Sequence, residues 1–527
     1  MSDLETPANR QIARAAGMVM VAFVVSNLTG LARQILVSKF FGTSMEMDAF
    51  SAANRVSETL FYLMAGGALS SAFIPTFTGL LTKGRRKDAW VLASAVANLV
   101  VLALILVSII AAIFALPIVR YVLAPGFSIN PVQEALTVDL LRLMLPSAVM
   151  FGLAGLAAGV LNSHQVFWVP AFMPALYQAG MIFGVLVLAP KMGIYGLGWG
   201  VVIGAALYLL LQLPSLWSLR GQYFPTFARH LAELREVAVL MLPRLFGVAV
   251  VQLNFWVNIR LASSMPEGSA AAITLALALM LMPQAAIAQS IAIAAMPTLS
   301  AQYALGKLDD MRSSLASSLR WALLLSIPAS LGLILLRLPV ITLLYQRGEF
   351  DEHSTELVAW ALLWYTAGLV GHALVEILSR AFYALHDTRT PVLVGSVAMG
   401  LNILLSLVFS QLFQKLGWMP HGGLALANSL ATALESVGLI FFMRRRLGSL
   451  QGLFILKATG QAVLAALVMW AVVWTWMDYM RLETAWLVTA GGVVLGALAY
   501  GLVAWAVGVT EFRRLAAYVF RRQGIGI

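Results

Sequence analysis

The chain has 527 residues, of which 61% are hydrophobic and only 11% are charged, and its formal net charge is +11. A soluble protein of this length carries far more charge to cover its surface, so the composition excludes a soluble globular protein. The chain contains no cysteine, which excludes disulfides, thiolate metal ligands and cysteine nucleophiles.

Apolar runs of about twenty residues recur from one end of the chain to the other, and a run of that length spans a bilayer as a helix. The N-terminal segment has no small-residue cleavage site after a short apolar core, so we expect the first helix to be retained. We predict an all-α integral membrane protein with about fourteen transmembrane helices. In chain order they cover residues 12–38, 49–81, 89–115, 136–161, 167–189, 195–218, 234–262, 270–302, 313–337, 354–385, 391–413, 421–443, 455–477 and 484–509.

Two of these predicted helices, 49–81 and 270–302, are longer than a bilayer requires, so they must tilt, bend or protrude. Glycine and proline inside them supply places to bend. These residues are Gly66, Gly67 and Pro75 in the first helix, and Pro283 and Pro297 in the second.

Basic residues gather in the loops on one side of this arrangement, whereas acidic residues dominate the opposite loops. Because cytoplasmic loops collect Lys and Arg, both termini are expected to be cytoplasmic, in a bacterial plasma (inner) membrane. The basic tail that starts at Glu511 is expected to lie on the inner surface. Basic residues in such short loops do not indicate binding to nucleic acid.

An internal repeat relates the two halves of the chain at a constant offset of 222 residues. The matching pairs are Pro75 with Pro297, Gly84 with Gly306, Asp88 with Asp310, Pro117 with Pro339, Gly126 with Gly348 and His164 with His386. Six predicted helices separate equivalent points, so the two copies share one orientation. The sequence therefore predicts two parallel six-helix lobes, residues 1–219 and 220–446, followed by residues 447–527 with two further helices and a basic cytoplasmic tail. Two such lobes favour a transporter that works by alternating access.

Ionisable and amide side chains interrupt several of the apolar helices, and inside a membrane such groups face a cavity or a partner. The candidate substrate-binding residues are Arg33, Asp48, Arg55, Arg244, Arg260, Ser26, Asn27, Asn254 and Asn258. Arginines that converge from both lobes would form a cleft that attracts anions, because guanidinium groups bind phosphate through a planar fork of donors. Alternatively, Arg33 and Arg260 extend to the membrane interface, and the amides only hold helices together.

Two sets of residues at helical spacing are candidates for gating or structural ion pairs. Glu58 lies three residues after Arg55, and Glu376 lies four residues before Arg380. The sequence shows no nucleotide-binding glycine-rich loop, no catalytic constellation and no histidine pair at metal-binding spacing. We therefore expect a transporter and no enzyme, with no metal and no ATP, driven by an ion gradient or the membrane potential.

Several motifs make the chain similar to the MurJ (MviN) family of lipid II flippases along nearly its whole length. They are Ser26–Arg33 with Phe41-Gly42 and Asp48-Ala49-Phe50, then Ala72–Pro75, Ala124–Phe127, Met296–Ser300 and Arg380–Pro391. The resemblance implies the fold of the multidrug/oligosaccharidyl-lipid/polysaccharide exporter superfamily. It also implies a cationic cavity for the pyrophosphate head of lipid II, and a groove for the polyprenyl tail formed with the last two helices.

The chain departs from the family pattern at several cationic positions. Asn27 and Gln34 stand where the first-helix motif has an arginine and an acid, Phe61-Tyr62 replaces an arginine pair, Gly66 replaces a glutamate, and residues 275–279 carry no charge. Arg33 and Asp48 carry over, and Arg55, Arg244 and Arg260 are the candidates for relocated charges.

We predict a flippase that moves lipid II, the peptidoglycan precursor, from the cytoplasmic to the outer face of the membrane. Such a protein serves cell-wall biogenesis and cell shape, and we expect a monomer in contact with membrane lipids and with cell-wall synthesis proteins. The alternatives are a flippase for another polyprenyl-pyrophosphate glycan, a cation-coupled drug exporter of the same superfamily, a glycosyltransferase that uses Glu46 and Asp48, and a scaffold without transport.

Overall fold

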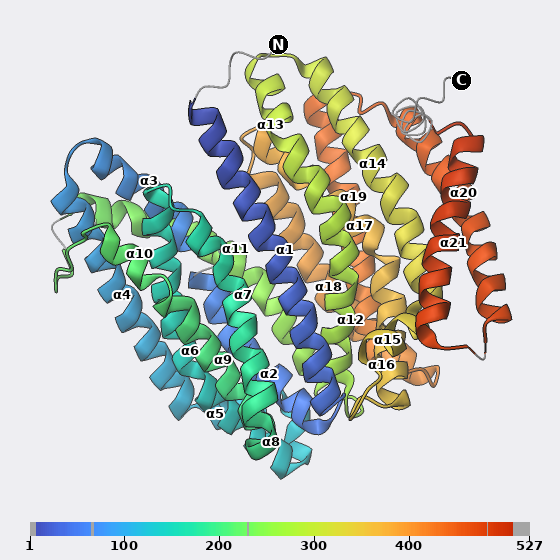
Figure 1. Ribbon diagram of the computed structural model, residues 1–527, viewed down its shortest axis with the longest axis horizontal. Coiled ribbons are helices and arrows are strands. Elements are labelled where there is room, and N and C mark those ends of the chain that lie inside the picture. The colour runs from blue at the N-terminus through green and yellow to red at the C-terminus, as the bar shows by residue number, and fades with distance from the viewer. Residues whose placement is uncertain (1–6, 65–67, 229–230, 482, 510–527) are drawn as a thin grey trace. The chain divides into compact units, whose positions relative to one another are not determined.

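The computed structural model describes residues 7–64, 68–228, 231–481 and 483–509, and within these ranges its regular secondary structure is helical (Figure 1). The chain forms two compact units. Unit 1 contains Met1–Ala271 and Arg347–Phe350, and unit 2 contains Ala272–Gln346 and Asp351–Ile527. The predicted all-helical fold is confirmed.

The helices of unit 1 are α1 (Pro7–Phe41), α2 (Met45–Met64), α3 (Ala68–Thr82), α4 (Arg86–Ile113), α5 (Ala115–Pro117), η1 (Ile118–Leu123), η2 (Pro125–Ile129), α6 (Pro131–Ser163), α7 (Trp168–Phe183), η3 (Gly184–Leu188), α8 (Ala189–Met192), α9 (Ile194–Leu210), α10 (Leu213–Ser218) and α11 (Ala232–Ala262). The helix α12 (Ser269–Gln284) begins in unit 1. Unit 2 continues with η4 (Ala285–Gln289), α13 (Ser290–Ala304), α14 (Leu308–Leu335), α15 (Arg337–Tyr345), α16 (Glu352–Ala367), α17 (Leu369–Ala384), α18 (Arg389–Lys415), α19 (His421–Leu447), α20 (Gly452–Tyr479) and α21 (Ala485–Ala506).

Twelve helices of the described ranges are long and apolar enough to cross a membrane, and the bent pair α16–α17 makes thirteen. The predicted count of about fourteen is therefore approximate. The predicted helix 49–81 corresponds to α2 and α3. Its centre, with Gly66 and Gly67, lies outside the described residues.

The long predicted helix 270–302 corresponds to one candidate span, Ser269–Ala304. Pro283 lies near the end of α12, and the π-helical turn η4 follows it before α13 begins. Proline lacks the N–H that would continue the helical hydrogen bonds, and a π-helical turn accommodates such an irregularity. A break at Gly368 was not predicted: α16 and α17 meet there with a bend of 47°. A Cβ on Gly368 would lie 2.5 Å from Oγ of Ser429, so the bend brings α19 close to the backbone.

The internal repeat is visible in the helix boundaries. Fifteen residues form each of α3 and α13, twenty-eight form each of α4 and α14, and both pairs begin and end 222 residues apart. The connecting turns also match, because Gly84 and Gly306 both have positive φ angles, of 75° and 70°. A left-handed backbone favours glycine, which explains why this residue recurs in both copies.

Helix α11 belongs to unit 1, where it packs against α3 and α2. The predicted lobes follow the internal repeat and meet between residues 219 and 220. The two units, in contrast, follow the packing of the helices, and the first unit extends to Ala271. The assignment of 220–446 to a C-lobe stays a prediction.

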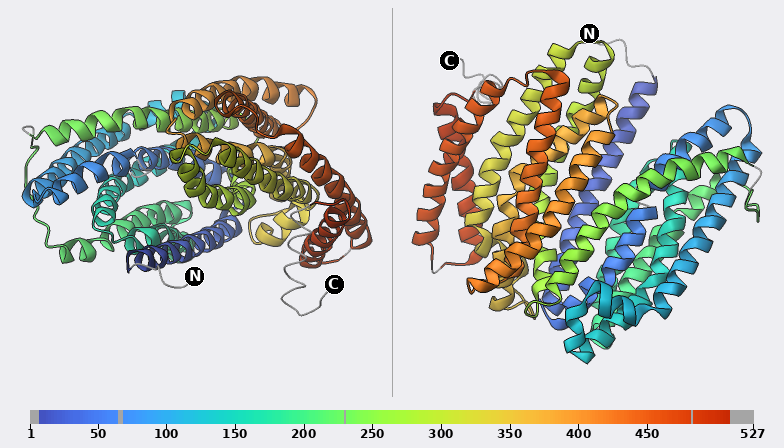
Figure 2. Two further views of the ribbon diagram at one scale, coloured as in Figure 1. Left: turned by 90° about the horizontal axis from the view of Figure 1, so that it is seen from above. Right: turned by 180° about the vertical axis from the view of Figure 1, so that it is seen from behind.

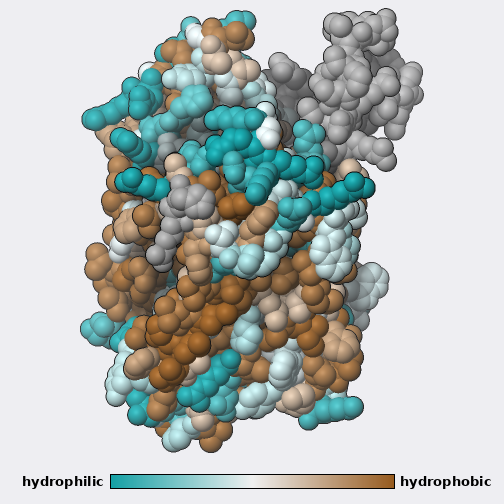
Figure 3. Space-filling model, turned by 90° about the vertical axis from the view of Figure 1, so that its left-hand side faces the viewer, coloured by the Kyte–Doolittle hydropathy of each residue, from teal (hydrophilic) through white to brown (hydrophobic). Residues whose placement is uncertain are grey.

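Helix α4 in unit 1 is strongly apolar, and the mean hydropathy of its most apolar segment reaches 2.9. Its exposed apolar side chains include Leu99, Leu102, Ile105, Leu106, Ile109, Ile110 and Ile113. Figure 3 shows this side of the molecule, where hydrophobic residues form a broad field and hydrophilic residues gather above and below it. Such a field suits contact with acyl chains.

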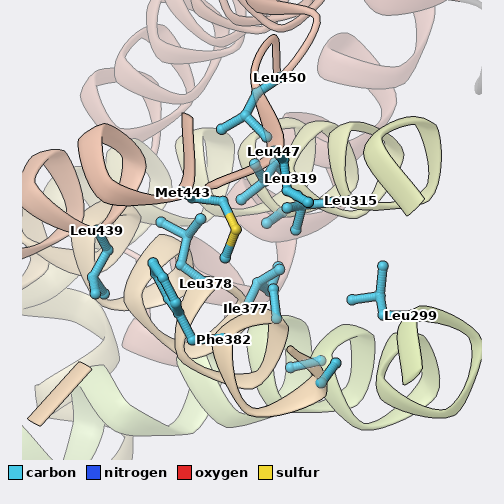
Figure 4. Packing of buried hydrophobic residues seen from close by; sticks show 14 of the residues in the cluster. Leu299, Leu315, Leu319, Ile377, Leu378, Phe382, Leu439, Met443, Leu447 and Leu450 are labelled. Carbon is cyan, nitrogen blue, oxygen red and sulfur yellow. The ribbon is translucent and has the colours of Figure 1, made fainter. Parts of the chain in front are cut away.

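In unit 2, buried side chains from α13, α14, α17 and α19 form one hydrophobic core (Figure 4). The last two helices, α20 and α21, lie side by side along α14 (Figure 2). The Tyr500 hydroxyl of α21 donates to the Leu324 carbonyl of α14 at 2.6 Å, and Trp476 Nε1 of α20 donates to the Val488 carbonyl of α21 at 3.1 Å. These bonds fix the two helices to unit 2.

The motif at residues 380–391 covers the end of α17, the connecting turn and the start of α18. Asp387 accepts hydrogen bonds from the backbone N–H groups of Arg389 and Thr390, at 3.1 and 3.0 Å, and from the Thr390 hydroxyl at 2.7 Å. Arg446 of α19 pairs with the same carboxylate at 3.2 Å. Burial alone would raise the pKa of Asp387, but the bonds from Thr390 and Arg446 outweigh it and lower the pKa. The motif therefore fastens α18 to α19.

Helices α7 and α9 of unit 1 approach each other along a seam of glycines. A Cβ on Gly180 would lie 2.3 Å from Cα of Gly204, and a Cβ on Gly184 would lie 2.5 Å from the Gly196 carbonyl oxygen. Small residues allow this close approach of helices in a membrane, where van der Waals packing drives association.

Replacing Gly180 with alanine is expected to destabilise the protein by roughly 1–3 kcal/mol, because two backbones must separate to admit the methyl group. The control is Gly247→Ala in α11, since nothing lies within 4 Å of a Cβ there. Thermal unfolding in detergent should show a lower midpoint for the first variant only. Equal midpoints would contradict the tight seam.

Candidate functional site

Arg33 lies in α1, inside a segment, Val21–Phe41, that is apolar enough to cross a membrane. Its Nη1 donates to the sulfur of Met181 in α7 at 3.4 Å, and its Nη2 donates to Gln34 Oε1 at 3.0 Å. Its Nε is buried and has no hydrogen-bond partner. The guanidinium therefore keeps an unused donor inside unit 1, and leaving such a donor unsatisfied is costly.

Arg55 in α2 forms the expected ion pair with Glu58, at 2.8 Å between Nη1 and Oε2. The guanidinium also lies 4.9 Å from the ring centroid of Phe255 in α11, a distance at which the ring face attracts the cation. Asn54 donates to the other Glu58 oxygen at 2.8 Å. As in Arg33, Nε of Arg55 is buried without a partner.

Packing links the surroundings of Arg33 and Arg55 within unit 1. Arg33 contacts Met181, one turn from Tyr177 in α7, and the Tyr177 ring packs through Phe151 against Phe61, which follows Arg55 and Glu58 on α2. We name Arg33, Arg55 and Glu58 the arginine cluster. Two cations against one anion leave it with one net positive charge, so it attracts anions.

Five aromatic rings lie next to the arginine cluster and form an aromatic cluster. They are Phe61 and Tyr62 of α2, Phe151 of α6, Tyr177 of α7 and Tyr208 of α9. Neighbouring ring centroids are 4.7–6.3 Å apart with edge-to-face geometry, the arrangement that aromatic pairs prefer. The rings fix this end of α2 within unit 1.

The predicted amides and Ser26 occupy different surroundings. Asn27 is exposed on α1 and donates to the Phe23 carbonyl of its own helix at 2.8 Å, while Ser26 is half-buried on the same helix. On α11, Asn258 donates to Asn254 at 3.4 Å, and both side chains are buried. The Asn258 oxygen has no hydrogen-bond partner, which leaves it as a buried acceptor in unit 1.

Asp48, a predicted substrate residue, is 2% exposed and its carboxylate is already occupied. Its two oxygens accept from the backbone N–H groups of Gly268 and Ala271, at 2.8 and 2.7 Å. These groups belong to the start of α12, whose first N–H donors have no partner within the helix. Asp48 therefore caps the start of α12, and its role in substrate binding stays a prediction.

The remaining predicted cations are described one by one. Arg260 is exposed at the end of α11 and donates to the carbonyl oxygens of Tyr121 and Val122. The Arg244 side chain lies outside the described residues. In unit 2, Arg380 pairs with Glu376 at 2.7 Å as expected, and both side chains are partly exposed.

Two residues of this site were not predicted. Tyr62 stood out in the sequence only as a departure from a family pattern, and Phe255 did not stand out. A signal for Tyr62 was present: Arg55, Glu58 and Tyr62 are spaced by three and four residues, which places them on one face of a helix. No such signal existed for Phe255, because its contact joins α11 to a helix far away in sequence.

Comparison with solved structures identifies the class of protein that has this fold. An inward-facing multidrug resistance MATE family transporter of the MOP superfamily aligns over 82% of this chain and 99% of its own, with a TM-score of 0.64 and 14% identity. A structure described as "Lipid II flippase MurJ, inward closed conformation" aligns over 94% of this chain and 99% of its own, with a TM-score of 0.80 and 24% identity. The chain therefore shares the fold of these two membrane proteins.

The family follows from the sequence comparisons. The family model described as "Lipid II flippase MurJ" matches residues 37–494. The lipid II flippase MurJ of Burkholderia cenocepacia is 32% identical over 511 residues, covering 94% of this chain and 97% of its own. The probable lipid II flippase MurJ of Vibrio cholerae is 27% identical over 443 residues, covering 82% of each chain. The chain belongs to the MurJ family.

Proposed function

We propose that this chain is a lipid II flippase of the bacterial inner membrane. It moves the polyprenyl-pyrophosphate glycopeptide from the cytoplasmic to the outer face by alternating access. Membership of the MurJ family supports this function. The observation that carries the mechanism is the arginine cluster, in which Arg33 and Arg55 each hold a buried Nε–H without a partner.

A pyrophosphate satisfies these donors. A guanidinium presents its N–H groups in a planar fork that matches two phosphate oxygens, and charge-assisted bonds of this kind are about twice as strong as neutral ones. Water is scarce in such a site, so an anion gains more from each bond than it would in bulk solvent. Arg33 and Arg55 therefore bind the pyrophosphate, while Glu58 holds the Arg55 guanidinium in place.

The orientation of the chain in the membrane and the driving force of transport are inferred from the sequence. Basic loops keep both termini in the cytoplasm. The chain has no nucleotide-binding loop, so an ion gradient or the membrane potential drives the cycle. The protein acts as a monomer among membrane lipids and hands its substrate to cell-wall synthesis proteins on the outer face.

The test is replacement of the native lipid II flippase in a bacterium from which that protein is depleted. We expect this chain to restore growth and normal cell shape, and the purified protein to move labelled lipid II across a proteoliposome membrane. Failure in both assays, with the chain correctly inserted, would refute the function. Transport of a different polyprenyl-pyrophosphate glycan in the same vesicles would then support the alternative that Asn27, Phe61 and Tyr62 favour, since they stand at the family's arginine positions.

A further inference from the structure

An exposed aromatic ring lies on the charged face of α2. Tyr62 follows Arg55 by seven residues and Glu58 by four, so all three side chains point to one side of the helix. The Tyr62 side chain is 43% exposed, and its hydroxyl has no hydrogen-bond partner within the part of the chain that the structure describes. The ring and its hydroxyl are therefore available to a ligand.

One side of the Tyr62 ring is fixed by its neighbours. Phe61 contacts it edge to face, with centroids 5.4 Å apart. Phe61 in turn packs against Phe151 at 4.7 Å and Tyr208 at 6.3 Å. A ring fixed in this way loses little conformational entropy when a flat ligand stacks on its free face.

The charges around Tyr62 identify the kind of ligand. A tyrosine that only anchors a helix at the lipid interface is expected to adjoin acyl chains and headgroups. Instead, Tyr62 shares one face of α2 with Arg55 and Glu58, whose side chains form an ion pair at 2.8 Å. A ring in such polar surroundings suits a ligand that has both apolar C–H faces and hydroxyl groups, which is the chemistry of a sugar ring. The face of an aromatic ring carries negative charge density that attracts the weakly positive C–H groups of the sugar.

The spacing of Arg55 and Tyr62 along α2 also fits a sugar that is bonded to a phosphate. Seven residues of α-helix rise about 10 Å, so Tyr62 lies about two turns from Arg55. In a lipid-linked glycan the first sugar is bonded directly to the pyrophosphate. A phosphate held by the long Arg55 side chain therefore places that sugar within reach of the Tyr62 ring.

We propose that Tyr62 is a stacking platform for the sugar ring attached to the pyrophosphate, and that it is a specificity-determining residue of the flippase. The proposal rests on the proposed function, because it assumes that Arg33 and Arg55 bind the pyrophosphate. Tyr62 thus selects glycan-bearing lipids over bare polyprenyl pyrophosphate.

The experiment measures binding to the full-length protein in nanodiscs. Three ligands are compared: polyprenyl pyrophosphate, the same lipid with one sugar and its peptide, and lipid II with two sugars. We expect the unmodified protein to bind both glycolipids about tenfold more tightly than the bare pyrophosphate, the size of effect that one aromatic contact provides. Tyr62→Ala should remove this preference, and Tyr62→Phe should keep it. The matched control is Tyr479→Ala, which truncates an exposed tyrosine of unit 2.

The outcomes separate the two hypotheses. If Tyr62→Ala weakens all three ligands equally, or if the unmodified protein shows no preference for sugar, the stacking proposal is overturned while the flippase function stands. If none of the three lipids binds to the unmodified protein, the proposed function itself fails. Retention of the preference in Tyr62→Phe shows that the loss in Tyr62→Ala comes from the ring and not from misfolding.

Discussion

Arg33→Ala is expected to weaken binding of lipid II about 10- to 100-fold, because hydrogen bonds to charged groups contribute roughly 1.5–3 kcal/mol. Among the described residues, the Arg33 guanidinium donates hydrogen bonds to two side chains, those of Met181 and Gln34. Its removal should therefore cost little stability. Transport in proteoliposomes should fall with binding, and Arg33→Lys should give an intermediate result, since an ammonium group lacks the planar fork.

Arg260→Ala is the matched control for this prediction. It removes a guanidinium of the same unit, but one that is exposed and bonded to the carbonyl oxygens of Tyr121 and Val122. We expect near-normal binding and transport. If Arg260→Ala and Arg33→Ala reduced binding equally, each arginine would act only through the overall charge of the protein. The arginine cluster would then not be the binding site of the pyrophosphate.

Asp48→Ala is expected to destabilise the protein by roughly 2–6 kcal/mol, because two buried backbone N–H groups at the start of α12 lose their acceptors. Asp48→Asn keeps one acceptor oxygen and should cost less. The measurement is thermal unfolding of the purified variants in detergent, together with lipid II binding per folded molecule.

Binding separates the capping role of Asp48 from the substrate role expected from the sequence. A capping residue leaves the affinity of the folded fraction unchanged, since its carboxylate contacts only backbone. A fall in affinity without a fall in the unfolding midpoint would restore Asp48 to the substrate site.

Most of the fold could be predicted from the sequence because membrane helices are specified locally. An apolar run determines a span without reference to the rest of the chain, and proline predicts a helical irregularity, as at Pro283. The break at Gly368 was missed because the contact that accompanies it, with Ser429, lies in another helix.

The candidate site was predicted only in part for the same reason. The pairing of Arg55 with Glu58 is local on α2 and could be predicted from spacing. The capping of α12 by Asp48 joins residues more than 200 positions apart, and no periodic pattern reports such a contact. The sequence therefore predicted a substrate role for Asp48 and gave no sign of its contacts with the start of α12.

The Arg55–Glu58 pair has a consequence for turnover. A pyrophosphate that arrives at Arg55 meets a guanidinium already engaged by a carboxylate at 2.8 Å, and it must share or displace that partner. Part of the attraction is thus cancelled by repulsion between two anions. A carrier that holds its cargo too firmly stalls after delivery, so we expect Glu58 to compete with a pyrophosphate bound by Arg55 and to promote its release.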